Sequence, residues 1–178
     1  MRPRSESRRQ YWGIRQPSDR KQALTNTLYR LLTTGTWNKP HQARRLSDAV
    51  EETLRHNPPL TGWLRNTTRE VQLSGIAVPA GTRLLLLLAS AGRDEDHHLT
   101  NPDTYDPQRP DTPPLLAFGA GIHYCPGAPY ARRLAHQALT ALAQTCPRLT
   151  LTDPGRAHPD AWPLNTALRV PRHLTATW

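Results

Sequence analysis

One cysteine framed by glycines constrains the fold of this chain more than any other feature. Residues 118–127 have the sequence FGAGIHYCPG, which places Cys125 directly before a predicted helix. Glycines allow tight turns and a close approach of the backbone to a flat group, and the amides and dipole of a helix N-terminus favour the thiolate form of a nearby cysteine. The loop therefore suits a thiolate that binds a metal.

Two other roles for Cys125 are a catalytic nucleophile and a zinc ligand. The sequence does not supply the additional residues that either role requires. It has only two cysteines, Cys125 and Cys146, no C-x-x-C pair and scattered histidines. No protease-like signature surrounds Cys125. Two cysteines are also few for a domain of this length that is held by disulfides, so we expect a reducing compartment, the cytoplasm.

The net charge of +9 comes almost entirely from arginine, since Lys21 and Lys39 are the only lysines. Such a charge permits nucleic acid, anionic lipid or an acidic protein as partner, but the chain has no zinc-finger spacing and no RNA-binding signature. Its longest apolar run, residues 84–89, is too short to span a bilayer. Residues 1–21 lack the apolar stretch of a signal peptide. We therefore expect neither nucleic acid nor membrane as a partner.

Apolar periodicity predicts three helices, which follow an N-terminal segment without regular structure. Residues 1–22 are rich in Arg, Ser and Gln without periodicity, which predicts a flexible basic arm. Helices are predicted over residues 23–35, from an N-cap at Ser47 to about residue 57, and from Gly127 or the next residue to about residue 143.

Short strands and a meander are predicted between the second and third helices. Residues 69–73 and 76–78 are expected to form a hairpin at Ser74-Gly75, a pair that suits a tight turn. The apolar residues 84–88 predict a buried strand. Residues 101–114 contain five prolines and no regular period, so they are expected to meander over the surface.

The pattern F-G-x-G-x-H-x-C-x-G, followed by Ala131-Arg132, resembles the cysteine-ligand loop of the cytochromes P450 at six fixed positions. The resemblance extends over about residues 46–178. It implies an α+β fold, mainly α with small β-sheets, in which residues 23–178 correspond to the C-terminal, haem-binding half of a truncated cytochrome P450 domain.

By this resemblance, haem b is the cofactor and Cys125 is the proximal axial ligand of its iron. Phe118 then packs beside the sulfur, and His123 contacts a haem propionate. Arg65 stands where many bacterial members carry an arginine that binds a propionate, a contact that suits the guanidinium group. The remaining implied haem contacts are the loop glycines Gly119, Gly121 and Gly127.

A second pattern, Glu52-Thr53-Leu54-Arg55, sets two opposite charges on one face of a helix. Such pairs are usually solvated and contribute little to stability. The resemblance gives the pair another role, because E-x-x-R precedes the cysteine loop in the family and a meander arginine joins it in a buried network. Arg109 matches that third position. We therefore expect Glu52, Arg55 and Arg109 to form a structural network.

The resemblance implies an oxidoreductase, a monooxygenase that takes electrons from a ferredoxin or a flavoprotein. The family pattern A-G-x-[DE]-T is absent, and residues 1–22 have no counterpart of the N-terminal half, so no catalytic residue is recognisable on the distal side. We expect an incomplete or inactive enzyme, with the missing half in a separate chain. The alternative is a non-catalytic haem-binding or protein-interaction fragment. A nucleic-acid binder, favoured only by the charge, ranks third.

Overall fold

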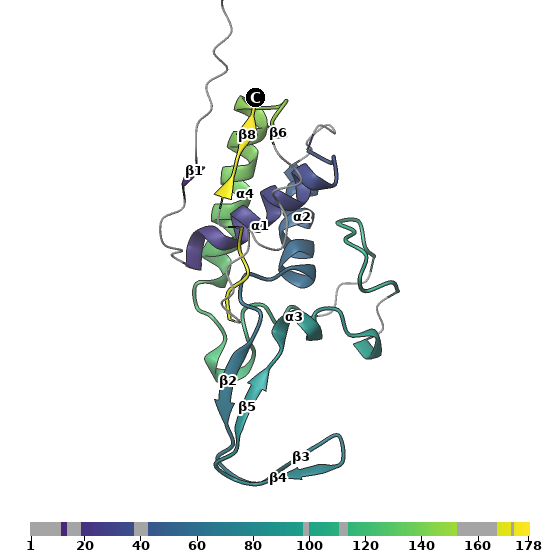
Figure 1. Cartoon of the computed structure of the whole chain (residues 1–178), viewed down its shortest axis with the longest axis vertical. Helices are drawn as coiled ribbons and strands as arrows, with labels where there is room; N and C mark the ends of the chain where they lie inside the picture. The colour runs from purple at the N-terminus through teal and green to yellow at the C-terminus, as the bar shows by residue number, and fades with distance from the viewer. Residues whose placement is uncertain are drawn as a thin grey trace, which may run out of the picture.

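Three helices that pack against one another form the body of the protein. The computed structural model describes residues 12–13, 19–37, 43–97, 100–110, 114–152, 167–171 and 173–178. Within these residues the long helices are α1 (Asp19–Thr33), α2 (Ala43–His56) and α4 (Ala128–Thr145), and each contacts the other two (Figure 1). The fold is mainly α with small sheets, as predicted.

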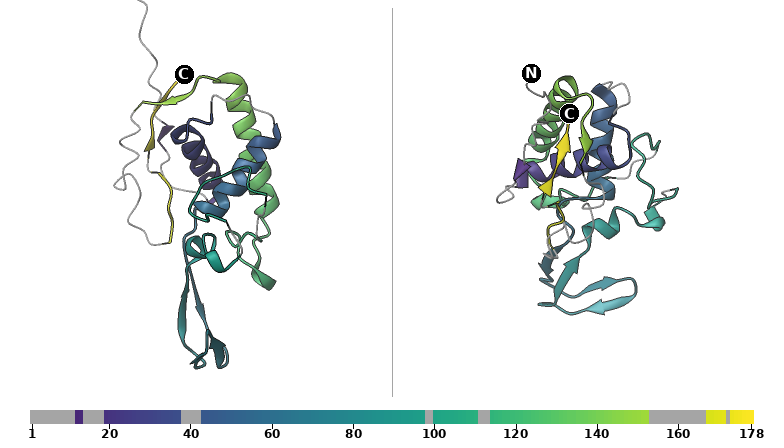
Figure 2. Two further views of the ribbon diagram at one scale, coloured as in Figure 1. Left: turned by 90° about the vertical axis from the view of Figure 1, so that its right-hand side faces the viewer. Right: turned by 45° about the horizontal axis from the view of Figure 1, so that its top comes forward.

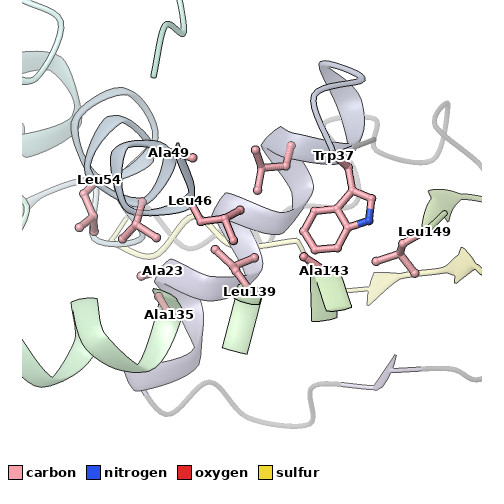
Figure 3. Close-up of a cluster of buried hydrophobic side chains, with 11 residues drawn as sticks. Ala23, Trp37, Leu46, Ala49, Leu54, Ala135, Leu139, Ala143 and Leu149 are labelled. Carbon is pink, nitrogen blue, oxygen red and sulfur yellow. The ribbon is translucent and has the colours of Figure 1, made fainter. Parts of the chain in front are cut away.

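The core lies between these helices and consists of apolar side chains at helical spacing. In α2, Leu46, Ala49, Val50 and Leu54 share one face and are all buried. Figure 3 shows Leu46 and Leu54 of this face close to Ala23 of α1 and to Ala135 and Leu139 of α4. The buried cluster consists of Ala23, Leu31, Trp37, Leu46, Ala49, Val50, Leu54, Ala135, Leu139, Ala143 and Leu149. Removal of this apolar surface from water holds the helices together.

Two helices begin earlier than the sequence predicts. Helix α1 begins at Asp19, inside the segment expected to be an arm, and α2 begins at Ala43. Ser47, the expected N-cap, is therefore an exposed residue within α2. The apolar face extends upstream of it because Leu46 is buried, and the preceding alanine and arginines favour a helix.

Part of the predicted flexible arm is paired with the C-terminal segment. Strand β1 (Trp12–Gly13) pairs antiparallel with β7 (His173–Leu174), with Trp12 opposite Leu174. Because the partner lies at the other end of the chain, no local pattern predicts this pairing. The expectation of an arm over residues 1–22 is thus wrong at residues 12–13 and 19–22, and its other residues lie outside the described ones.

Three further antiparallel pairs of strands complete the sheets of the described residues. They are β2 (Trp63–Asn66) with β5 (Arg83–Leu86), β3 (Val71–Leu73) with β4 (Ile76–Val78), and β6 (Thr150–Leu151) with β8 (Ala176–Thr177). The turn between β3 and β4 has φ of 48° at Ser74 and 81° at Gly75, which defines a hairpin turn with two left-handed residues. This hairpin confirms the prediction.

The prediction of a buried strand over residues 84–88 is wrong. Leu85 of β5 is 57% exposed and Leu87, just beyond it, is 57% exposed, while Leu64 of the paired strand β2 is also 57% exposed. Figure 1 and Figure 2 show the β2–β5 pair and the β3–β4 hairpin projecting from one end of the helical body. A continuous apolar run predicts cover on both faces, and the described elements do not supply it.

The segments around the cysteine loop largely follow expectation. Helix α4 begins at Ala128, next to an N-cap at Gly127, and residues 100–110 have no regular helix or strand. Residues 111–113 of the expected meander lie outside the described residues. The short helix α3 (Leu88–Ala91) and two single 3-10 turns, Glu95–His97 and Gly121–His123, connect these segments. Among the described helices, none has both the length and the apolar character needed to cross a bilayer.

Candidate functional site

Residues 118–127 form a loop that folds back on itself and leads into α4. The amide of Cys125 donates to the carbonyl oxygen of Phe118 at 3.0 Å, and the amide of Ala128 donates to the carbonyl oxygen of Cys125 at 3.2 Å. Gly119 and Gly121 have φ of 75° and 70°, a left-handed conformation that glycine adopts without steric penalty. These turns fix the cysteine at the start of the helix.

The surroundings of Cys125 leave room for a flat group. Its thiol is free and half-buried. A Cβ atom added at Gly121 would meet nothing within 4 Å, and one added at Gly127 would lie 3.8 Å from the Cys125 sulfur. Ile122, between them, is 96% exposed. The loop thus has the donor atom and the open space that a haem with a thiolate ligand requires, so these residues fit the group that the sequence implies.

The two expected propionate ligands are both exposed. His123 lies in the 3-10 turn of the loop, and Arg65 lies on β2, outside the loop. The guanidinium carbon of Arg65 is 5.6 Å from the ring centroid of Trp63, and its Nη1 donates to the carbonyl oxygen of Leu64 at 3.1 Å. Among the described residues Arg65 has no acidic partner, so its charge is available to an anion.

Arg55 is buried and uses all five of its N–H donors. Two of them form a bidentate pair with Glu52, each at 2.7 Å. The others donate to the carbonyl oxygens of Gly92 at 2.7 Å, Pro102 at 2.9 Å and Thr104 at 3.1 Å. A buried charge is tolerated when it is paired and fully hydrogen-bonded, and Arg55 meets both conditions.

Arg109 joins this pair from the irregular segment at residues 100–110. Its Nε is 3.8 Å from Oε1 of Glu52, and its terminal nitrogens donate to the carbonyl oxygens of Thr100, Asn101 and Thr104. The same Glu52 oxygen accepts a hydrogen bond from the amide of Asp106 at 2.8 Å. The structure therefore brings the three expected network residues together, and they tie α2 to residues 100–110.

A neighbouring polar cluster has no signal in the sequence. Nδ1 of His56 lies 2.8 Å from Nη2 of Arg30, and its Nε2 lies 2.8 Å from the carbonyl oxygen of Asp103. Because a guanidinium group only donates, Nδ1 accepts and Nε2 carries the proton. Nearby, burial raises the pKa of Tyr105 to about 12, and its hydroxyl lies 3.1 Å from that of Thr53. All three contacts join segments far apart in sequence, which explains why periodicity misses them.

His56 is expected to make the stability depend on pH. Burial lowers its pKa below 6.5, and the charges of Arg30, Arg93 and Arg55 lower it further, while the Asp103 carbonyl opposes them. The unfolded chain therefore binds a proton more readily than the folded one, so the free energy of unfolding falls as the pH drops through 6.5 towards the folded pKa. Urea unfolding at pH 7.5 and 5.5 measures this loss.

The His56→Gln variant identifies the source of that pH dependence. Glutamine keeps an N–H donor for the Asp103 carbonyl and cannot take up a proton in this range. The variant should lose less stability than the wild type between the two pH values. Equal losses in both proteins would show that other groups cause the pH dependence.

Comparison with known proteins places the chain in a family. Residues 36–170 match the family model of cytochrome P450. The cytochrome P450 monooxygenase PikC of Streptomyces venezuelae is 39% identical over 135 residues, which are 75% of this chain and 31% of PikC. Erythromycin C-12 hydroxylase of Saccharopolyspora erythraea is 38% identical over 108 residues, 60% of this chain and 27% of the hydroxylase.

A solved structure shows the same fold. The P450 haem domain of Tepidiphilus thermophilus matches with a TM-score of 0.78 at 33% identity, covering 89% of this chain and 38% of that one. The chain belongs to the cytochrome P450 family, a family of haem-thiolate proteins. It spans between about a quarter and a third of the length of the curated relatives that it matches.

Proposed function

We propose that this chain binds haem b through the thiolate of Cys125 and provides the haem-holding side of a P450-type oxidoreductase. The observation that carries the proposal is the position of Cys125, a free cysteine held by the Phe118 carbonyl at the start of α4 beside space that glycines leave open. When bound, haem supplies the oxygen chemistry, and a thiolate ligand donates electron density that favours cleavage of the O–O bond.

The remaining loop residues have supporting roles in this proposal. Phe118 packs beside the sulfur, and Gly119, Gly121 and Gly127 keep the backbone close to the porphyrin ring. The haem propionates are bound by two exposed basic side chains, those of His123 and Arg65. The guanidinium of Arg65 has no acidic partner among the described residues, which supports this role, because a fork of N–H donors matches a carboxylate.

Glu52, Arg55 and Arg109 have a structural role in this proposal. Their contacts fix residues 100–110 to α2, and α2 packs against α4, the helix that Cys125 precedes. We place the start of the haem-binding portion at α1, since Gln22 and Ala23 are buried on that helix.

Substrate choice and oxygen activation belong, in this proposal, to a further part of a P450 fold, in this polypeptide or a second one. Two observations support it. The matched haem domain has 62% of its length outside the region that this chain covers (100% minus 38%). The strands β2 to β5 also expose large apolar side chains that such a part would bury. These side chains are Trp63, Leu64, Leu73, Ile76, Leu85 and Leu86.

We further propose that a complete assembly acts as a monooxygenase in the cytoplasm. It receives electrons from a ferredoxin or a flavoprotein. We propose neither a nucleic acid nor a membrane as partner.

Haem titration tests the proposed function. Absorbance should saturate at one haem per chain, and Gly121→Ala should weaken the affinity by about tenfold. The added Cβ lies beside the porphyrin, and a free loop that relaxes from the left-handed conformation must return to it on binding, at a cost on the order of 1–2 kcal/mol. Gly35→Ala is the matched control. Gly35 has φ of 65° and open space at its Cβ position, but it lies in the turn after α1.

The two glycine variants separate a haem site from unspecific uptake. Gly35→Ala should retain the affinity of the wild type. Haem uptake that does not saturate, or that the two variants weaken equally, would contradict a site at the loop.

A further inference from the structure

One side chain connects the cysteine loop to a neighbouring helix. Arg132, in the second turn of α4, donates from Nε to Oε1 of Glu51 on α2 at 2.7 Å. Its Nη1 donates to the hydroxyl of Tyr124 at 3.2 Å, and its guanidinium carbon lies 4.7 Å from the ring centroid of Phe118. Arg132 thus contacts both aromatic residues of the loop and a carboxylate outside it.

Both aromatic residues are directly coupled to the backbone of Cys125. Phe118 accepts the hydrogen bond from the Cys125 amide, and Tyr124 precedes Cys125 in the chain. Their rings also contact each other edge to face, with centroids 6.5 Å apart. Phe118 and Tyr124 thus both adjoin the peptide that orients the sulfur, one through a main-chain hydrogen bond and the other through the chain itself.

An arginine suits this position better than any other residue. Its planar guanidinium stacks on an aromatic face while its edge donates hydrogen bonds, which an ammonium group cannot do together. Burial disfavours the charge of Arg132, but the hydrogen bonds that it donates to Glu51 and Tyr124 outweigh that effect and raise its pKa. The side chain therefore remains charged and can hold both contacts at once.

We infer that Arg132 is a positioning residue, which, anchored by Glu51, holds Phe118 and Tyr124 in place and thereby fixes the orientation of the Cys125 sulfur. The consequence for haem ligation rests on the proposed function. The effect of Arg132 on the order of the loop is independent of the proposed function, because every contact involved lies within the protein. The inference can therefore be tested with and without haem.

The first test measures the order of the loop without haem. Cys146→Ser leaves Cys125 as the only thiol, and its reaction with a disulfide reagent reports how freely the loop opens. Arg132→Gln should increase the labelling rate severalfold, and Glu51→Gln should increase it less, because an amide still accepts the hydrogen bond. Arg132→Lys should not restore the wild-type rate, since lysine lacks the fork and the flat face.

Arg133→Gln is the matched control for this test. Arg133 is the next residue of α4, it is exposed, and the described residues give it no ion pair. In the Arg133→Gln variant, Cys125 should react at the same rate as in the parent chain. Thermal unfolding of each variant is recorded in parallel, and we expect little change, because a partly exposed ion pair adds little to stability. If Arg132→Gln does not fold, Glu51→Gln alone decides the outcome.

The second test measures ligation with haem bound. In the ferrous carbon monoxide spectrum, Arg132→Gln should convert part of the thiolate-type band into one typical of a neutral ligand, and Arg133→Gln should not. If no variant binds haem but labelling is still faster in Arg132→Gln, the proposed function fails and the positioning role stands. Equal labelling rates for Arg132→Gln, Arg133→Gln and the parent chain would overturn the inference.

Discussion

Replacing Arg55 by alanine is expected to lower the free energy of unfolding by about 3–5 kcal/mol. Glu52 is 2% exposed, so the variant leaves its carboxylate buried without the bidentate partner. The carbonyl oxygens of Gly92 and Pro102 also lose their side-chain donor, and that of Thr104 keeps only the one from Arg109. Arg109 lies 3.8 Å from Glu52 and compensates only in part. Urea unfolding gives the difference, which is a large fraction of the stability of an ordinary domain.

Two further variants show whether burial causes this effect. Arg55→Lys keeps the positive charge but cannot make the fork of contacts, so it should still destabilise the protein substantially. Arg93→Ala removes a comparable side chain from an exposed pair, since its Nη1 lies 3.8 Å from Asp103, whose side chain is 84% exposed. That loss should be below about 1 kcal/mol. If Arg55→Ala and Arg93→Ala lose the same amount, Arg55 has no structural role.

Features that depend on neighbouring residues can be predicted from the sequence. The hairpin at Ser74-Gly75 follows from residues that adopt positive φ, and the start of α4 follows from the glycine at its N-cap. The spacing of Glu52 and Arg55 alone places both on one face of α2. In each case the determining residues lie within one or two turns of each other.

Features that depend on distant partners cannot be predicted in this way. The pairing of Trp12 with Leu174 joins two segments near opposite ends of the chain. The exposure of Leu85 depends on which elements cover the β2–β5 pair, and an apolar run carries no information about that. Main-chain carbonyls carry no residue-specific signal, so the acceptors around Arg55 are visible only in the structure.

In the candidate site too, contacts between neighbouring residues can be predicted from the sequence, and contacts between distant residues cannot. The loop around Cys125 is apparent from its spacing, and Arg109 is reached only through the resemblance to a family. The link from Arg132 to Glu51 is missed, because the two residues lie on different helices, α4 and α2. Only the adjacency of Arg132 to the loop motif gives a partial signal.

Replacing Cys125 by serine is expected to abolish thiolate ligation of haem. Serine has nearly the same shape, so the loop and its bond to the Phe118 carbonyl should persist, but a hydroxyl group does not serve as a thiolate. Cys146→Ser is the matched control. The carbonyl oxygen of Cys146 accepts the hydrogen bond from the Trp37 indole at 3.1 Å, and this main-chain contact survives the substitution. Only the Cys125 variant should therefore lose the ligand.

The central claim is that Cys125 ligates haem iron, and the carbon monoxide spectrum of the reduced, haem-loaded protein tests it most directly. The wild type and Cys146→Ser should show the red-shifted Soret band of a thiolate ligand, and Cys125→Ser should lack it. A histidine-type spectrum in the wild type, or a red-shifted band that persists in Cys125→Ser, would contradict the claim.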